Sequence, residues 1–292
     1  MRPRVFAAAV IIMMLAASIA FAQDLAYTEF VAYIPNEGRM IPATVCLPAG
    51  QSGETFPAVV MLHGTGSSRD EAGNGYKMLA PYMAQNRIAS IRFDFAGQGD
   101  SAADYVEYSY TSGASDAVAC AEFLKNLKVV DPSRIGIMGW SQGGSVAILA
   151  AARNQQFKAL LTWAGALDMF DFFSALYPEA KANGFVKMDL GWRPPLNLSL
   201  KWFEEAKGIS LRDELKTFKG PVLAIAGSAD TTVPLSDLDG IVASAGGVDK
   251  AKYLIDGADH TFNVFTDDLS KFNQLMKVTT DWFKSKLQNI GL

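Results

Sequence analysis

The fold is decided by residues 134–144, which read Arg-Ile-Gly-Ile-Met-Gly-Trp-Ser-Gln-Gly-Gly. The first half is an apolar run typical of a buried strand, and residues 143–153 that follow it have helical spacing. A strand that turns directly into a helix at Gly-x-Ser-x-Gly holds its serine in a strained conformation with the hydroxyl exposed. This pattern predicts that Ser141 is a nucleophile, and the alternative is a tight structural turn with an idle serine.

Outward from this turn, strands alternate with helices. The expected strands are 27–34, 40–47, 57–62, 88–95, 135–140, 159–163, 222–226 and 253–255. The expected helices are 75–86, 112–127 (with Ser112 as its cap), 143–153 and 269–287. The first two strands are separated by a turn cluster and predict an antiparallel hairpin. The remaining alternation predicts an α/β fold with a mostly parallel sheet of about eight strands and helices on both faces.

One segment interrupts the alternation. Residues 165–219 contain many aromatic side chains and the pair Pro194-Pro195, but no clear buried strand. More than fifty residues are too many for an ordinary connection. We therefore expect an inserted cap, and the alternative is a set of surface helices that pack their aromatics on the main core.

The N-terminus has the pattern of a secretory signal. Arg2 and Arg4 precede an apolar run of about 13 residues, and the small side chains of Ala20 and Ala22 precede Gln23. We expect residues 1–22 to be a signal peptide, with a hydrolase domain over 23–292. The alternative is an uncleaved anchor, although the run is shorter than the ~20 residues that span a bilayer. No other stretch approaches that length, so we expect a secreted or periplasmic protein without stable membrane insertion after cleavage.

Composition excludes several functional classes. The chain has 292 residues, of which 50% are hydrophobic and 19% charged, so it has enough apolar material for a large core. The net charge is −4 with no basic run, which argues against nucleic acid as a partner. Two cysteines do not make a disulfide scaffold or a four-ligand zinc site. Pairing of Cys46 with Cys120 stays open, although two buried free thiols are the favoured interpretation.

A serine nucleophile needs a base, and the chain has two histidines. His260 follows the last expected strand, and we predict that it is the general base. Asp230, in the loop after strand 222–226, is the predicted carboxylate that orients it. Asp256 and Asp259 are rival orienters, and Asp230 can instead be an ordinary turn residue that binds its own backbone.

The sequence also predicts an oxyanion hole. His63-Gly64-Thr65-Gly66 follows strand 57–62, and a glycine-rich loop there can present a backbone N–H to a developing oxyanion. We expect the backbone N–H groups of Thr65 and Gln142 to form this hole. His63 is interpreted as a brace for the loop and not as the base.

These residues resemble the α/β-hydrolase superfamily. The resemblance covers about residues 27–287 and is carried by His63–Gly66, Arg92–Ser101, Gly139–Gly144, Gly227–Asp230 and Gly257–His260. The chain is similar to bacterial feruloyl (cinnamoyl) esterases, although Trp140 stands where that subfamily usually has His. The resemblance implies ester hydrolysis by Ser141, His260 and Asp230. It also implies that polar groups of the cap bind the phenol of the substrate, and Asp171 is the nearest candidate for such a group.

The sequence therefore predicts a serine hydrolase that cleaves small-molecule carboxylic esters, feruloyl, cinnamoyl or short-chain acyl, through an acyl-enzyme on Ser141. It needs no cofactor and no metal. One alternative is a serine aminopeptidase-like peptidase with the same triad. Another is a non-catalytic binding protein on this fold. The oligomeric state does not follow from the sequence.

Overall fold

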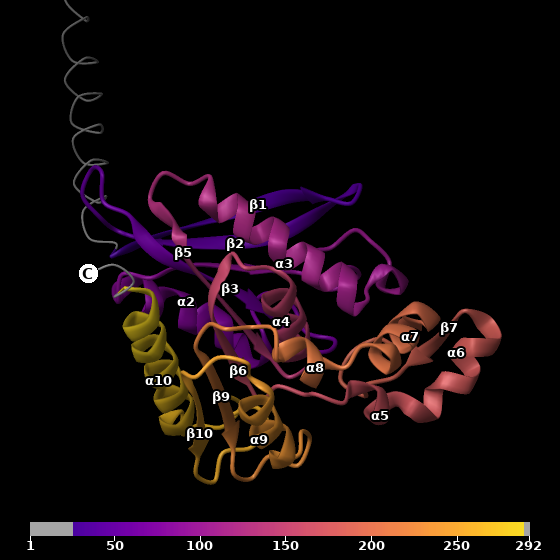
Figure 1. Ribbon diagram of the computed structural model, residues 1–292. Coiled ribbons are helices and arrows are strands. Elements are labelled where there is room, and N and C mark those ends of the chain that lie inside the picture. The colour runs from indigo at the N-terminus through magenta and orange to yellow at the C-terminus, as the bar shows by residue number, and fades with distance from the viewer. Residues whose placement is uncertain (1–25, 289–292) are drawn as a thin grey trace, which may run out of the picture.

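The computed structural model describes residues 26–288 and is built around one eight-stranded sheet (Figure 1). The strand order is β1-β2-β4-β3-β5-β6-β9-β10. Their bounds are β1 Tyr27–Asn36, β2 Arg39–Pro48, β3 Phe56–Leu62, β4 Ala89–Phe93, β5 Val130–Trp140, β6 Phe157–Trp163, β9 Val222–Gly227 and β10 Lys250–Ile255. The pairs β1–β2 and β2–β4 are antiparallel and the others are parallel. This confirms the predicted α/β-hydrolase fold. The predicted signal peptide, residues 1–22, lies outside the described residues.

Helices cover both faces of the sheet and bury two separate apolar clusters. One face carries α3 (Tyr110–Lys125), α4 (Gln142–Arg153), α8 (Leu211–Leu215) and α9 (Leu235–Ser244). The other face carries α2 (Gly75–Gln85) and α10 (Ser270–Leu287). All seven residues of β3 are buried. Parallel strands of this kind appear in the sequence as continuous apolar runs, because helices cover both of their faces. No helix in the described part of the chain is both long and apolar enough to cross a membrane.

The two cysteines lie on opposite faces of the sheet. Cys46 packs with Ala80 and Ala84 of α2, and Cys120 belongs to the larger cluster under α3. Both are buried free thiols, so the favoured sequence interpretation agrees with the structure. Burial raises the pKa of the Cys46 thiol to about 12, which keeps it protonated and unreactive at neutral pH.

Between β6 and β9 the chain forms an insertion that projects beyond one side of the sheet (Figure 1). Before α8 it contains α5 (Met169–Phe173), η3 (Ser174–Leu176), α6 (Tyr177–Asn183), β7 (Phe185–Met188), β8 (Leu196–Ser199) and α7 (Leu200–Gly208). Its centre is aromatic, with Phe203 contacting Trp202, Phe170 and Tyr177 at ring-centroid distances of 5.1 to 6.4 Å. The hairpin of β7 and β8 was not predicted, because each strand has only four residues and β7 alternates between exposed and buried positions.

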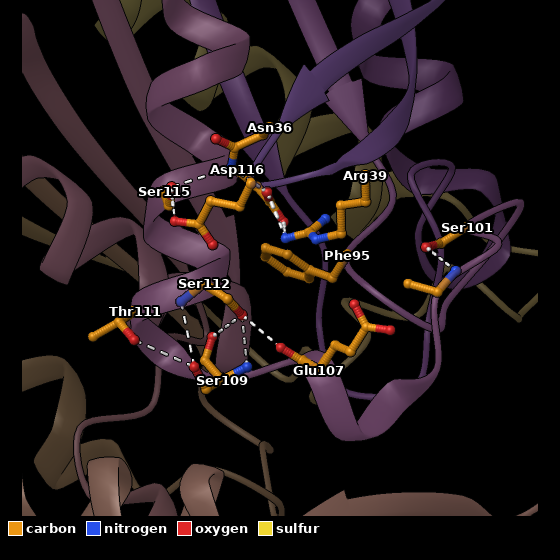
Figure 2. Close-up of polar contacts among 12 residues, drawn as sticks. Asn36, Arg39, Phe95, Ser101, Glu107, Ser109, Thr111, Ser112, Ser115 and Asp116 are labelled. Carbon is orange, nitrogen blue, oxygen red and sulfur yellow. Dashed lines mark hydrogen bonds and ion pairs between the residues drawn. The ribbon is translucent and has the colours of Figure 1, made fainter.

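Helix α3 begins earlier than its sequence pattern predicted. The prediction placed its cap at Ser112, but the helix begins at Tyr110 and Ser109 is the N-cap (Figure 2). The Ser109 hydroxyl accepts from the Ser112 N–H at 3.3 Å, and the Ser112 hydroxyl accepts from the Ser109 N–H at 2.8 Å. Two serines three positions apart thus satisfy each other's backbone donors, and the first of them sets the helix start. Short 3₁₀ turns precede α2 and α3, namely η1 (Ala72–Asn74) and η2 (Tyr105–Glu107).

A buried ion pair fastens α3 to the β1–β2 hairpin (Figure 2). Arg39 Nη2 donates to both carboxylate oxygens of Asp116 at 2.7 Å, and Asn36 donates to the same carboxylate at 2.8 Å. The Asp116 side chain is fully buried. Burial raises the pKa of its carboxyl to about 6, although Arg39 and Asn36 both oppose the shift. The pair therefore costs desolvation, and its contacts must offset that cost.

We expect Asp116→Ala to lower the free energy of unfolding at pH 7 by about 3 kcal/mol, because it leaves the Arg39 guanidinium mostly buried and unpaired. Urea unfolding followed by circular dichroism measures the change. The control is Asp281→Ala, which removes an exposed partner of Lys277 on α10 and should leave the urea midpoint unchanged. An Asp116→Ala protein as stable as wild type would contradict this role for the pair.

Candidate active site

The turn between β5 and α4 places Ser141 in a strained backbone conformation. Its φ of 53° and ψ of −122° are rarely adopted by residues other than glycine. The flanking glycines are needed for clearance. A Cβ on Gly139 would lie 2.0 Å from the carbonyl oxygen of Gly143, and one on Gly143 would lie 2.2 Å from the carbonyl oxygen of Leu62. The helix can therefore start directly at the strand end and close against the loop after β3.

His260 and Asp230 are joined by a hydrogen bond. The loop after β10 carries His260 and the loop after β9 carries Asp230, and the distance from His260 Nδ1 to Asp230 Oδ2 is 2.8 Å. The Asp230 side chain is fully buried, and its Oδ1 accepts from the N–H groups of Thr232 and Val233. Asp230 thus both forms its own turn and binds the imidazole. With Nδ1 on the carboxylate, Nε2 is the nitrogen left to exchange protons with a nucleophile.

The rival carboxylates make other contacts. The Asp256 carboxylate accepts from the hydroxyl of Ser228, and the Asp259 carboxylate accepts from backbone N–H groups of its own turn at Thr261 and Asn263. Neither is a hydrogen-bond partner of the imidazole. Of the three candidates, Asp230 is the one that the fold places against His260.

Ser141 and His260 line one cavity of about 650 Å³. Among the contacts of residues 26–288, no hydrogen bond joins the two side chains, and a serine–histidine contact often tightens only when substrate is bound. Much of the apolar part of the wall comes from the insertion and from the loop after His260. It includes Met169, Phe172, Phe173, Leu190, Trp192 and Phe265.

Two backbone N–H groups are free at the predicted oxyanion position. Neither Thr65 nor Gln142 has an acceptor for its N–H within the described residues, and Gln142 is the first residue of α4, where an N–H has no intrahelical partner. Thr65 and Ser141 both line the cavity. The helix N-terminus also favours negative charge at this place.

His63 braces the loop that carries Thr65. Its Nε2 accepts from the backbone N–H of Phe95 at 3.2 Å, so Nδ1 carries the proton and donates to the carbonyl oxygen of Gly64 at 2.8 Å. Complete burial lowers the pKa of His63 to about 4, so the ring is neutral at physiological pH. Because both nitrogens are engaged away from Ser141, His63 acts through the loop, as its sequence position suggested.

The structure does not bring Asp171 into the cavity. Asp171 lies on α5 with its side chain exposed, while its neighbours Phe172 and Phe173 form part of the wall. A candidate chosen for its polarity and its place in the insertion therefore lies outside the cavity, although Met169, Phe172 and Phe173 of the same helix line it.

Two residues make contacts in the site that were not predicted from the sequence. Trp140 donates from its indole Nε1 to the carbonyl oxygen of His260 at 3.2 Å, which holds the histidine loop against the serine turn. Glu71 is buried in the cavity wall and accepts a hydrogen bond from the backbone N–H of Gly64 at 2.6 Å. The motif around Ser141 includes Trp140 but does not indicate its bond to the His260 loop, and no motif marks Glu71. No cluster of three metal-binding side chains occurs among the residues that the structure describes.

A family model named the prolyl oligopeptidase family matches residues 109–289. The chain belongs to this family. The matched region contains Ser141, Asp230 and His260, whereas the loop 63–66 precedes it.

Curated relatives are distant in sequence. The chain is 27% identical over 217 residues to 2,6-dihydropseudooxynicotine hydrolase of Paenarthrobacter nicotinovorans, a match that covers 70% of this chain and 52% of that protein. It thus spans about half the length of that relative. It is also 27% identical over 216 residues to a putative carboxymethylenebutenolidase of Methylorubrum extorquens, covering 70% of this chain and 62% of the relative.

Solved structures agree in fold. Est1E of Butyrivibrio proteoclasticus, solved with ferulic acid bound, superposes with a TM-score of 0.72 at 20% identity and covers 88% of this chain and 100% of its own. A dienelactone hydrolase of Anabaena variabilis gives a TM-score of 0.64 at 18% identity, and the match covers 90% of this chain and 99% of that chain. The protein has the fold of the α/β-hydrolase superfamily and resembles feruloyl esterases in that fold.

Proposed function

We propose that this protein is a serine hydrolase that cleaves carboxylic esters through an acyl-enzyme on Ser141. The observation that carries the proposal is the pairing of His260 with buried Asp230 in the cavity where the strained Ser141 turn opens. The bond between Nδ1 and the carboxylate fixes the tautomer that leaves Nε2 free to accept the serine proton.

In the proposed reaction, Ser141 Oγ attacks the ester carbonyl while His260 Nε2 takes its proton. The backbone N–H groups of Thr65 and Gln142 bind the resulting oxyanion. Collapse of the tetrahedral intermediate expels the alcohol, which receives the proton from His260. Water then loses a proton to His260 and attacks the acyl-enzyme. Collapse of this second tetrahedral intermediate releases the acid, and His260 returns the proton to Ser141 Oγ. The sequence of steps uses no cofactor.

The cavity supports an apolar or aromatic group on the substrate. The exposed surface of its wall is mainly apolar and includes aromatic rings, beside the polar side chains of Thr65, Ser67, Glu71, Thr232 and Thr261. Its volume of about 650 Å³ lies within the usual range for small-molecule sites. The fold likeness to an esterase that binds ferulic acid is consistent with an aryl-substituted acyl group. We therefore propose feruloyl, cinnamoyl or short-chain acyl esters as the substrate class.

We predict that Ser141→Ala lowers kcat/KM for p-nitrophenyl acetate by about 10³-fold or more, because the acyl-enzyme cannot form. Hydrolysis is followed by release of p-nitrophenol. Ser133→Ala is the matched control, since Ser133 is exposed and its hydroxyl donates only to nearby Asp131. Retention of most activity in Ser141→Ala would remove Ser141 from the mechanism.

A second candidate is cleavage of short peptides with the same residues, and membership of the prolyl oligopeptidase family favours it. We expect kcat/KM to be higher for methyl ferulate and p-nitrophenyl esters than for aminoacyl p-nitroanilides. The reason is that the cavity wall is largely apolar and offers few partners for the amide groups of a peptide. A panel of the three substrate types at equal enzyme concentration measures this. Higher rates on the anilides would replace the esterase proposal with the peptidase.

We also propose that the protein is exported, on the basis of the signal pattern in residues 1–22. Expression of the full chain in a bacterium, followed by fractionation and N-terminal sequencing, should give a periplasmic or secreted protein that begins at Gln23. An uncleaved chain in the membrane fraction would support an anchor instead.

A further inference from the structure

Glu71 has an unusual backbone conformation for a residue with a side chain. Its φ of 62° and ψ of 175° fall in a region adopted almost only by glycine, at a cost of about 1 to 3 kcal/mol. Glu71 lies in the cavity wall, immediately before the 3₁₀ turn η1. Strain of this kind persists where surrounding contacts hold the residue in place.

The Glu71 carboxylate bridges two backbone segments. Oε2 accepts from the N–H of Gly64 at 2.6 Å, and Oε1 accepts from the N–H of Ala72 at 3.0 Å. The first bond reaches back seven residues to the loop after β3. The second bond, from the Ala72 N–H, holds the carboxylate against its own turn. The side chain therefore links η1 to the loop after β3.

The loop that Glu71 holds lies against the nucleophile. A Cβ placed on Gly64 would lie 3.4 Å from the Ser141 Cβ and 3.7 Å from Glu71 Oε1. Gly64 is fixed on both sides, because Glu71 binds its N–H and His63 Nδ1 binds its carbonyl oxygen. That carbonyl shares a planar peptide with the N–H of Thr65, so fixing it also fixes the direction of the Thr65 N–H.

Burial makes this placement costly. It raises the pKa of the Glu71 carboxyl from its ordinary value of 4.5 to about 7. Since the folded pKa lies above the unfolded one, this group stabilises the fold less and less as pH rises from about 4.5 through 7, and the loss is complete above that range. A strained backbone and a buried carboxylate both oppose folding, and the hydrogen bonds to Gly64 and Ala72 offset only part of that cost.

We propose that Glu71 is a positioning residue that aims the Thr65 N–H at the oxyanion formed on the Ser141 adduct. The inference rests on the proposed ester hydrolysis. Glu71 does not itself transfer a proton in this role. It holds Gly64 so that a donor is in place before the substrate arrives, which is the condition for effective oxyanion stabilisation.

The test is Glu71→Gln, which keeps the shape of the side chain but leaves one amide nitrogen that cannot accept from a backbone N–H. We expect kcat for p-nitrophenyl acetate to fall about 10- to 100-fold with little change in KM, because the donor matters in the transition state and not in substrate binding. The control is Glu122→Gln on α3, whose exposed carboxylate pairs with Lys125 outside the cavity.

A second readout separates positioning from a general effect on folding. An aryl trifluoromethyl ketone forms a hemiketal oxyanion on the serine, so its inhibition constant should rise in parallel with the loss of kcat in Glu71→Gln. The inhibition constant of the product acid should stay within about threefold of wild type. If Glu71→Gln does not fold, Glu71→Gly removes the carboxylate and accepts the backbone conformation, and the same pattern is expected.

The outcomes distinguish this inference from the proposed function. If Glu71→Gln and Glu71→Gly keep wild-type kcat and ketone affinity while Ser141→Ala is inactive, Glu71 has no positioning role and the esterase proposal stands. Equal losses of ketone and product-acid affinity would also overturn the positioning role of Glu71, since they indicate general disruption of the cavity. If Ser141→Ala stays active, the proposed function itself fails.

Discussion

The structure depends on the close approach of α4 to the end of β3, which glycine at position 143 permits. With a Cβ at that position the helix would collide with the carbonyl oxygens of Leu62 and His63. The contact does two things at once. It completes the strained turn that exposes Ser141, and it brings the first N–H of the helix beside the loop that carries Thr65. One packing contact therefore places both the nucleophile and the Gln142 N–H next to the loop that carries Thr65.

The parallel sheet brings the other groups to the same place. Loops that follow parallel strands leave the sheet at one edge, so residues after β3, β5, β9 and β10 meet there although they are up to about two hundred positions apart in the chain. Short contacts then lock the loops together. Trp140 holds the backbone of His260, His63 and Glu71 hold Gly64, and Asp230 holds the imidazole. The insertion between β6 and β9 adds much of the apolar wall that encloses the edge.

The sequence predicted those features that local pattern determines. Buried parallel strands are continuous apolar runs, and the turn at Ser141 needs glycine at fixed offsets, so the sheet and the place of Ser141 could be inferred directly. The scarcity of histidine singled out His260. The contacts of Glu71 and Trp140 could not be found this way, because each binds a backbone group of another loop and no local pattern specifies such a bond. Asp171 was selected for its polarity and its place in the insertion, and the side of α5 on which it lies follows from packing within the insertion.

The central claim is that Ser141 is activated by His260. The most direct measurement is reaction of the purified protein with a fluorophosphonate, followed by mass spectrometry of the digested protein. The account predicts one phosphonyl adduct, on the peptide that contains Ser141, and its loss when His260 is replaced by Ala. An unmodified Ser141, or an adduct that forms at the same rate without His260, would contradict it.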